Sequence, residues 1–161
     1  MNTSIDVDDQ IQTVLLKYSD MVIRIAFQNL KNTADAEDIA QEVFLKLITT
    51  HPDFENSTHE KAWIIRVTVN LCKDFLKSSW FKKRAALNEN IPMHDENTEV
   101  LDAVLRLPVK FRNVIYLHYY EDMTVAQIAN ILQKKENTVS SWLYRARKLL
   151  KKSLTGGFDD E

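Results

Sequence analysis

The chain has 161 residues, of which 45% are hydrophobic, two are glycine and three are proline, a composition that suits two small helical domains. No apolar run is long enough to cross a bilayer, and the N-terminus lacks the basic and apolar regions of a secretory signal. The formal net charge of −2, averaged over the chain, argues against a nucleic-acid-binding protein.

Helical spacing of apolar side chains predicts two helices at the start of the chain. The first covers residues 7–31 and is interrupted at Asn32 and Thr33. The second covers residues 35–48, and acidic side chains in its first turn suit the positive end of the helix dipole. The pair His51-Pro52 is expected to stop it.

A third, longer helix is predicted to follow. Ser57 and Glu60 have the spacing of a capping box, and the helix is expected to run to about Trp80. Its expected apolar stripe comprises Trp63, Ile64, Val67, Leu71 and Phe75. Cys72, the one cysteine, has no partner for an internal disulfide and suits a packing role in a reducing cytoplasm.

The sign of the charge changes along the second half of the chain. Residues 86–102 have five acidic and no basic side chains, and the polar stretch around Pro92 has no apolar periodicity, which predicts an acidic linker. Residues 103–154 have ten basic and three acidic side chains, a net charge of +7. This segment therefore has the charge expected for binding phosphates, although the chain average conceals it.

The basic segment contains the pattern of a helix-turn-helix. Thr124 and Gln127 form a capping box that opens a short helix ending near Leu132, and Asn137 is a good N-cap for the next. The buried positions expected on the two helices are Val125, Ile128, Ala129, Leu132, Val139, Leu143, Ala146 and Leu150. In such a motif the second helix enters the major groove of DNA. An amphipathic hairpin with a solvated basic face would show the same pattern, so the motif needs support from the rest of the chain.

The outward positions of this second helix divide into two groups. The base-edge candidates are Asn137, Thr138, Ser140 and Ser141, and the outward aromatic and basic residues are Tyr144, Arg145 and Lys148. Tyr144 and Arg145 are expected to lie nearer the phosphates. The four histidines lie far apart, and the chain has no glycine-rich phosphate loop. The sequence therefore predicts no enzyme, metal, cofactor or small-molecule substrate.

Three ordered segments resemble regions 2 and 4 of bacterial sigma-70-family factors, and more narrowly the extracytoplasmic-function group. They are Asp35-Ala-Glu-Asp-Ile-Ala-Gln-Glu-Val-Phe44, Lys61-Ala-Trp-Ile-Ile-Arg-Val-Thr-Val-Asn70 with Asp74, and Leu107-Pro-Val-Lys-Phe-Arg-Asn-Val-Ile-Tyr-Leu117. The resemblance implies an all-α protein with a region 2-like domain at 1–85, an acidic linker at 86–100, a region 4-like domain at 101–154 and an acidic tail at 155–161.

The resemblance also implies roles for individual residues. Docking on the β′ clamp helices of RNA polymerase core would fall to Asp38, Gln41, Glu42 and Phe44. Recognition and opening of the promoter −10 element would fall to Asn56, Trp63, Arg66, Asn70, Asp74 and Lys77. Packing is the favoured role of Trp63, with stacking on DNA as the alternative. The helix that follows Pro108 would support the helix-turn-helix, which would read the −35 element. The β flap would meet Val114, Leu117 and Tyr120.

This chain departs from the family pattern within the helix-turn-helix. Gln133 and Asn137 stand where the family usually has glycine, and Ser140 and Trp142 stand where it tends to have basic residues. If Gln133 needs a positive φ, its backbone conformation is expected to cost stability. The missing basic residues predict weaker and less salt-sensitive binding to the −35 element.

The expected function is that of a cytoplasmic sigma factor. It would bind promoter DNA together with core polymerase, and an anti-sigma protein is an expected partner. A stand-alone helix-turn-helix regulator and a pure protein-interaction module are the alternatives.

Overall fold

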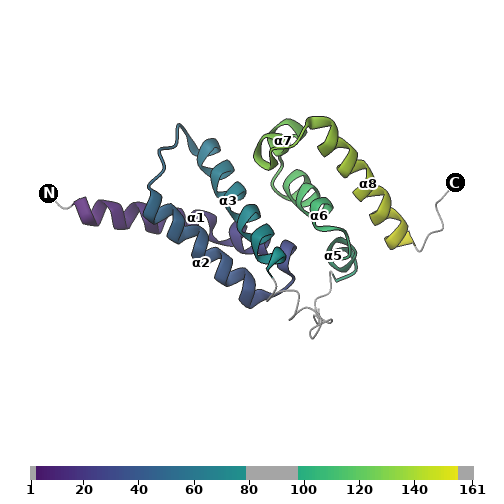
Figure 1. The fold of residues 1–161 in the computed structure, drawn as a ribbon, viewed down its shortest axis with the longest axis horizontal. Coiled ribbons are helices and arrows are strands. Elements are labelled where there is room, and N and C mark those ends of the chain that lie inside the picture. Colours follow the sequence, from purple (N-terminus) through teal and green to yellow (C-terminus); the bar gives the residue numbers. More distant parts are fainter. Residues whose placement is uncertain (1–2, 79–97, 156–161) are drawn as a thin grey trace. The chain divides into compact units, whose positions relative to one another are not determined.

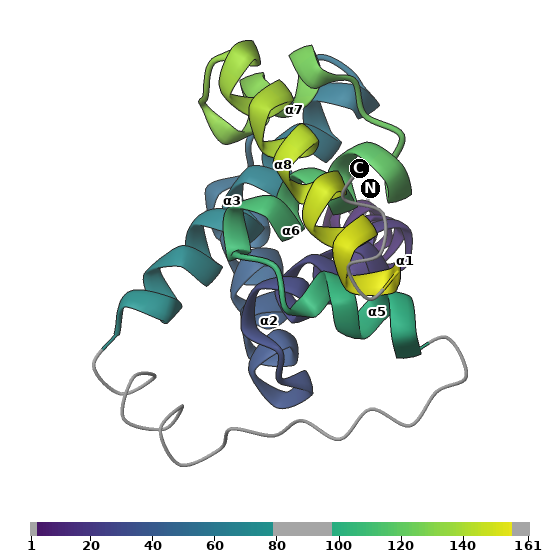
Figure 2. The same ribbon diagram turned by 90° about the vertical axis from the view of Figure 1, so that its right-hand side faces the viewer.

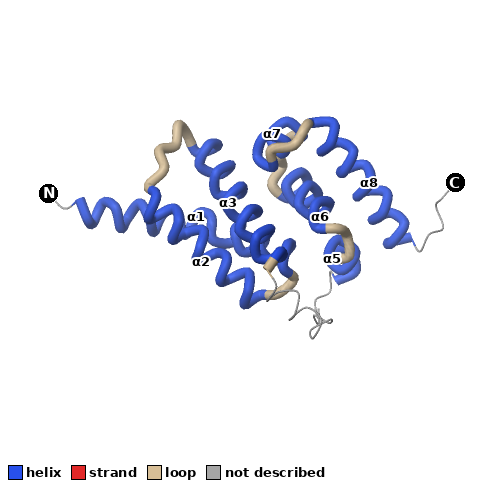
Figure 3. The backbone as a smooth tube through the Cα atoms, viewed as in Figure 1, coloured by secondary structure: helices blue, strands red, loops and turns tan. Residues whose placement is uncertain are grey.

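A computed structural model of the protein describes residues 3–78 and 98–155. Every element within these two ranges is a helix, as the sequence predicts. The chain divides into two compact units, Met1–Lys83 and Arg84–Glu161 (Figures 1 and 3). The predicted helix end at Trp80, the acidic stretch up to residue 97 and the tail from residue 156 lie outside the described residues.

The first unit is a three-helix assembly of α1 (Thr3–Leu30), α2 (Thr33–Thr50) and α3 (Ser57–Lys77), and each helix packs against the other two. Its core side chains are almost wholly removed from solvent. They include Val22, Ile25, Ala26, Ala36, Val43, Ile64, Ile65 and Cys72. Burial raises the pKa of the Cys72 thiol to about 12, so the thiol stays protonated and has the predicted packing role.

Side-chain caps define the turns of this unit. Asn32 accepts a hydrogen bond from the Asp35 amide at 2.9 Å and caps α2. His51 ends α2 in the left-handed region at φ 45°. The predicted capping box of α3 is wrong by one residue, because Asn56, not Ser57, is the N-cap and accepts from the His59 amide at 2.9 Å.

The buried face of α3 also differs from the predicted stripe. Ile64, Ile65, Thr68 and Cys72 are buried, whereas Trp63, Val67, Leu71 and Phe75 are half-buried. Residues four apart on an α-helix are offset by about 40°, so a stripe read at that spacing turns by about 120° over three steps. The predicted stripe thus follows the edge of the interface.

The second unit packs α5 (Thr98–Leu105), α6 (Val109–Ile115) and α7 (Val125–Leu132) against the long helix α8 (Glu136–Thr155) (Figure 2). The π-helical turn η1 (Tyr116–Tyr120) continues α6. The core side chains include Phe111, Val114, Leu117, Ile128, Ile131, Val139, Leu143 and Ala146. On α7 the buried residue near the end is Ile131, and the predicted Leu132 is half-buried.

The start of the helix-turn-helix is as predicted, and its second half differs. The Gln127 amide donates to Thr124 Oγ1 at 3.1 Å, and the Thr124 amide donates to Gln127 Oε1 at 2.9 Å, which confirms the capping box. Gln133 ends α7 at φ 56°, the left-handed backbone that glycine usually occupies. Asn137 is not the N-cap of α8, because the helix has already begun at Glu136.

A buried arginine fastens the turn between α5 and α6. Arg112 Nη1 donates to the carbonyls of Leu105 at 3.0 Å and Leu107 at 2.8 Å. Its side chain is 4% exposed, and burial lowers its pKa to about 10. Arg112 therefore serves the fold, although the sequence counts it among the cations available to DNA.

Candidate nucleic-acid and protein interfaces

One face of α2 presents a continuous exposed stripe. Asp38, Gln41 and Glu42 are all exposed, and they have the spacing of neighbours on one side of a helix. Leu45 follows at the next position of the same stripe and is 61% exposed. The stripe thus combines carboxylates, an amide and one large apolar side chain. Carboxylates repel the phosphates of DNA, so this stripe suits a protein partner better than it suits DNA.

Phe44 is a correction to the predicted docking residues. Its side chain is 6% exposed and lies with Val43 in the core of the first unit, so it has no surface to offer a partner. The sequence contained a signal for the residue it missed. Leu45 lies seven positions after Asp38, which places the two on the same face of a helix.

The outward face of α3 collects five of the six residues expected to meet the −10 element. Asn70, Asp74 and Lys77 are exposed and lie on the side opposite the buried Ile64 and Thr68. Trp63 and Arg66 continue this face towards the start of the helix and are half-buried. The five residues follow helical spacing over four turns. One side of α3 thus offers an aromatic ring, an amide, a carboxylate and two cations.

The sixth residue expected to meet the −10 element, Asn56, is also the N-cap of α3. Its Oδ1 caps α3, so the side chain is fixed at one end, while the residue remains exposed. The side-chain amide of Asn56 can still meet a base, because the cap uses neither its NH₂ group nor the second lone pair of Oδ1.

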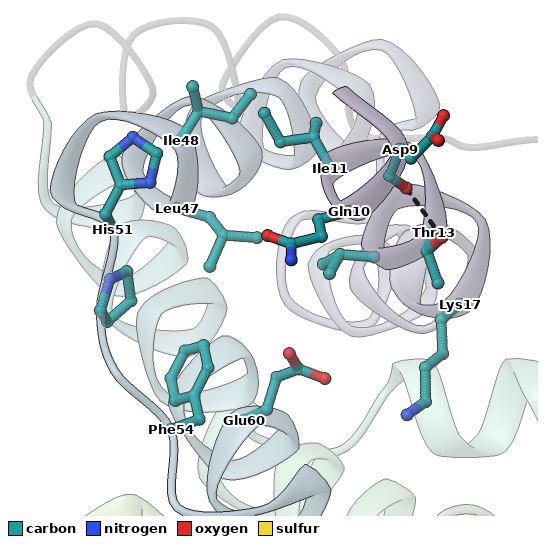
Figure 4. Close-up of a pocket in the computed structure, with 12 residues that line it drawn as sticks. Asp9, Gln10, Ile11, Thr13, Lys17, Leu47, Ile48, His51, Phe54 and Glu60 are labelled. Carbon is teal, nitrogen blue, oxygen red and sulfur yellow. Dashed lines mark hydrogen bonds between the residues drawn. The ribbon is translucent and has the colours of Figure 1, made fainter. Parts of the chain in front are cut away.

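The loop that carries Asn56 borders a hollow within the first unit. The hollow has a volume of about 490 Å³ and lies between α1, the end of α2, the loop and the first turn of α3 (Figure 4). Its apolar lining comes from Ile11, Val14, Leu47, Ile48, Pro52 and Phe54. On this side the loop therefore lacks the close packing that would fix it against α1.

The exposed face of α8 carries the residues expected to meet the −35 element. Asn137, Ser140, Tyr144, Arg145 and Lys148 are exposed. Thr138 and Ser141, at the margin of this face, are half-buried. The Lys148 ammonium lies 5.9 Å from the centre of the Tyr144 ring, within the range of a cation–π contact.

Two side chains of α8 are engaged with other elements of the second unit. Trp142 is half-buried, and the ammonium of Lys110 on α6 lies 5.5 Å from its ring. Arg147 Nη1 donates to the hydroxyl of Tyr119 at 2.6 Å. Trp142 thus faces α6, whereas the family tends to have a cation at this position.

The residues expected to meet the β flap separate into two groups. Val114 and Leu117 are 0% and 1% exposed and belong to the core, which corrects the expectation for both. Tyr120 is 54% exposed, and its neighbour Tyr119 is 53% exposed. The rings of Tyr120 and Tyr116 are stacked at 5.0 Å. An exposed aromatic surface therefore remains at η1.

Residues 3–78 and 98–155 contain neither a membrane-spanning helix nor a metal-binding group. No helix there has the length and apolar character needed to cross a membrane. No three histidine, cysteine, aspartate or glutamate side chains there are grouped so that they could hold a metal ion.

Two protein families match successive parts of the chain. Residues 14–82 match the family described as "Sigma-70 region 2", and residues 97–150 match "Sigma-70, region 4". The RNA polymerase sigma factor SigV of Bacillus subtilis is 33% identical over 139 residues, which cover 82% of this chain and 83% of SigV. The ECF RNA polymerase sigma factor SigW of the same species is 25% identical and covers 85% and 84%.

A solved structure has the same fold. It is the sigma factor RpoE in complex with the anti-sigma factor NepR from Bartonella quintana, with a TM-score of 0.73 and 21% identity, covering 94% of this chain and 99% of RpoE. CnrH in complex with the cytosolic domain of CnrY gives a TM-score of 0.69 and 19% identity, covering 92% of this chain and 90% of CnrH.

Proposed function

The chain belongs to the extracytoplasmic-function group of the sigma-70 family and directs promoter-specific transcription initiation, and we propose that separate surfaces divide this task. The α2 stripe binds the β′ clamp helices of core polymerase. The outward face of α3, with Asn56, recognises the −10 element and assists its melting. The exposed face of α8 reads the −35 element.

The observation that carries this proposal is the presence of polar, exposed faces on α2, α3 and α8, each backed by a buried face of the same helix. Melting requires cationic and aromatic side chains that hold an unpaired strand, and α3 presents both. Sequence readout requires short polar side chains near the start of a helix in the major groove. Asn137, Ser140 and Ser141 on α8 meet that requirement.

The stand-alone regulator is not favoured. A helix-turn-helix regulator of that kind would need the second unit alone, whereas the chain also matches the region 2 family over residues 14–82. We place the protein in the cytoplasm with the polymerase and assign it no reaction of its own, because the polymerase catalyses RNA synthesis.

Contacts with further proteins belong to this proposal. Tyr120 and Tyr119 at η1 form the surface for the β flap. An anti-sigma protein is an expected partner, since two structures with the same fold, RpoE and CnrH, were solved as complexes with NepR and CnrY. Such a partner would block initiation by covering the faces of α2 and α3.

Run-off transcription with purified core polymerase tests the proposal. We expect promoter-dependent initiation with the wild-type chain. The variant Gln41→Ala/Leu45→Ala should lower the affinity for core about tenfold or more, because it truncates an amide and an exposed apolar side chain, two of the four side chains of the stripe.

The matched control is Glu37→Ala, which alters an exposed acidic residue of α2 that borders the stripe beside Gln41 but is not one of its four residues. It should bind core like the wild type. Equal affinity of all three chains for core would refute the assignment of the α2 stripe, and an unchanged transcript pattern with the wild-type chain would refute the function.

A further inference from the structure

One residue of α3 makes several contacts with the loop that precedes the helix. His59 contacts three successive loop residues, each in a different way. Its ring packs edge-on against Phe54, with ring centres 5.4 Å apart. Its Nδ1 accepts a hydrogen bond from the Glu55 amide at 3.2 Å. Its own amide donates to Asn56 Oδ1 at 2.9 Å.

The aromatic contact extends one turn further along α3. Phe54 also packs edge-on against Trp63, with ring centres 5.7 Å apart. His59 and Trp63 are four residues apart and lie on the same side of the helix. The Phe54 ring therefore touches both rings. Phe54 also borders the 490 Å³ hollow, and the contacts described for Phe54 and Glu55 all come from α3.

We propose that His59 is the positioning residue of the −10-binding loop: its imidazole fixes Phe54 and Glu55, and thereby holds Asn56 and Trp63 in the arrangement that receives the opened strand. This inference rests on the proposed role of α3 and Asn56 in opening the −10 element. His59 itself need not touch DNA. A loop ordered before binding loses less conformational entropy when it captures a base, so loss of the imidazole contacts should slow opening.

The hydrogen bond to Glu55 fixes the tautomer of His59. An amide N–H can only donate, so Nδ1 of His59 must be unprotonated and the ring proton lies on Nε2. His118 supplies an internal control, because its Nδ1 lies 2.8 Å from the carbonyl oxygen of Met123. A carbonyl can only accept, so His118 carries its proton on Nδ1.

Nitrogen NMR of the full chain, at a pH where both rings are neutral, tests the loop geometry without any promoter. The expected result is the Nε2–H tautomer for His59 and the Nδ1–H tautomer for His118. The Nδ1–H tautomer in His59 would overturn the hydrogen bond from Glu55 and with it the proposal.

Variants of His59 test the positioning role in the holoenzyme. His59→Ala removes the ring and the acceptor, whereas His59→Asn keeps an acceptor close to the place of Nδ1. His59 is exposed, so neither change opens a cavity in the core. Opening is followed by the fluorescence of 2-aminopurine placed in the −10 element, and Thr58→Ala, at an exposed neighbouring position, is the matched control.

We expect opening to be about fivefold or more slower with His59→Ala, within about twofold of wild type with His59→Asn, and unchanged with Thr58→Ala. Affinity for core should be equal in all four proteins. Wild-type opening by His59→Ala, or equal defects in the Ala and Asn variants, would overturn the proposal. A wild-type holoenzyme that opens no promoter would instead refute the proposed function, before any variant is compared.

Discussion

Replacing Gln133 by glycine should stabilise the helix-turn-helix unit. Gln133 has φ 56° and φ values in this region cost a residue with a Cβ about 1–2 kcal/mol. The backbone N–H of Gln133 donates to the carbonyl oxygens of Ala129 and Asn130, so the turn has a defined shape. Glycine adopts this backbone without the steric cost but loses about 0.5–1 kcal/mol through the greater entropy of the unfolded chain. The expected net gain is about 0.5–1 kcal/mol.

Urea unfolding of the full chain, with hydrogen exchange of the α7 and α8 amides to assign the change to this unit, measures the effect. Gln133→Ala keeps the Cβ and should leave the free energy of unfolding nearly unchanged. Asn130→Gly places glycine at an exposed position inside α7 and should cost about 0.3 kcal/mol, the difference between the helix propensities of asparagine and glycine. A destabilised Gln133→Gly variant would refute the idea that the positive φ of Gln133 lowers the free energy of unfolding.

Two further changes test the other helices. Phe44→Ala should destabilise the first unit by about 3–5 kcal/mol, because it leaves a cavity in the core, and chemical denaturation would show this without any polymerase. Arg145→Ala should weaken the binding of the holoenzyme to all −35-containing duplexes and reduce the salt slope by about one unit, since arginine there is expected to meet a phosphate. Ser141→Ala should instead change the preference at a single base pair. Uniform losses from both α8 variants, measured over a panel of duplexes, would contradict the separation of phosphate and base contacts.

The sequence predicts the fold well because its helices have clear starts and stops. The capping box at Thr124, the stop at His51-Pro52 and the interruption at Asn32 are all local signals, and the structure uses each of them. Two glycines in 161 residues, both in the tail at 156 and 157, were a further signal. Any left-handed turn within the helical units had to use another residue, as Lys31 and Gln133 do.

The predictions from sequence that were wrong concern side chains whose exposure depends on the neighbouring helices. Phe44 and Leu45 are adjacent apolar residues, and the packing of α1 and α3 against α2 decides that one is buried and the other exposed. Asn56 and Ser57 are both good N-caps, and the choice between them depends on where the loop joins α3. The contacts of His59 with the loop likewise depend on how Phe54 folds back, which no spacing rule gives.

The charge of the second unit shows the same dependence on tertiary structure. Of its basic side chains, Arg112 is buried on backbone carbonyls and Arg147 is bonded to Tyr119. Ser140 and Trp142 occupy positions where the family tends to have cations. Fewer cations are therefore available to phosphates than the net charge of +7 implies, and each phosphate contact contributes about 0.9 to the salt slope. We therefore expect weak −35 binding by α8 alone, so that promoter affinity depends on the polymerase and on the proposed contacts of α3 with the −10 element.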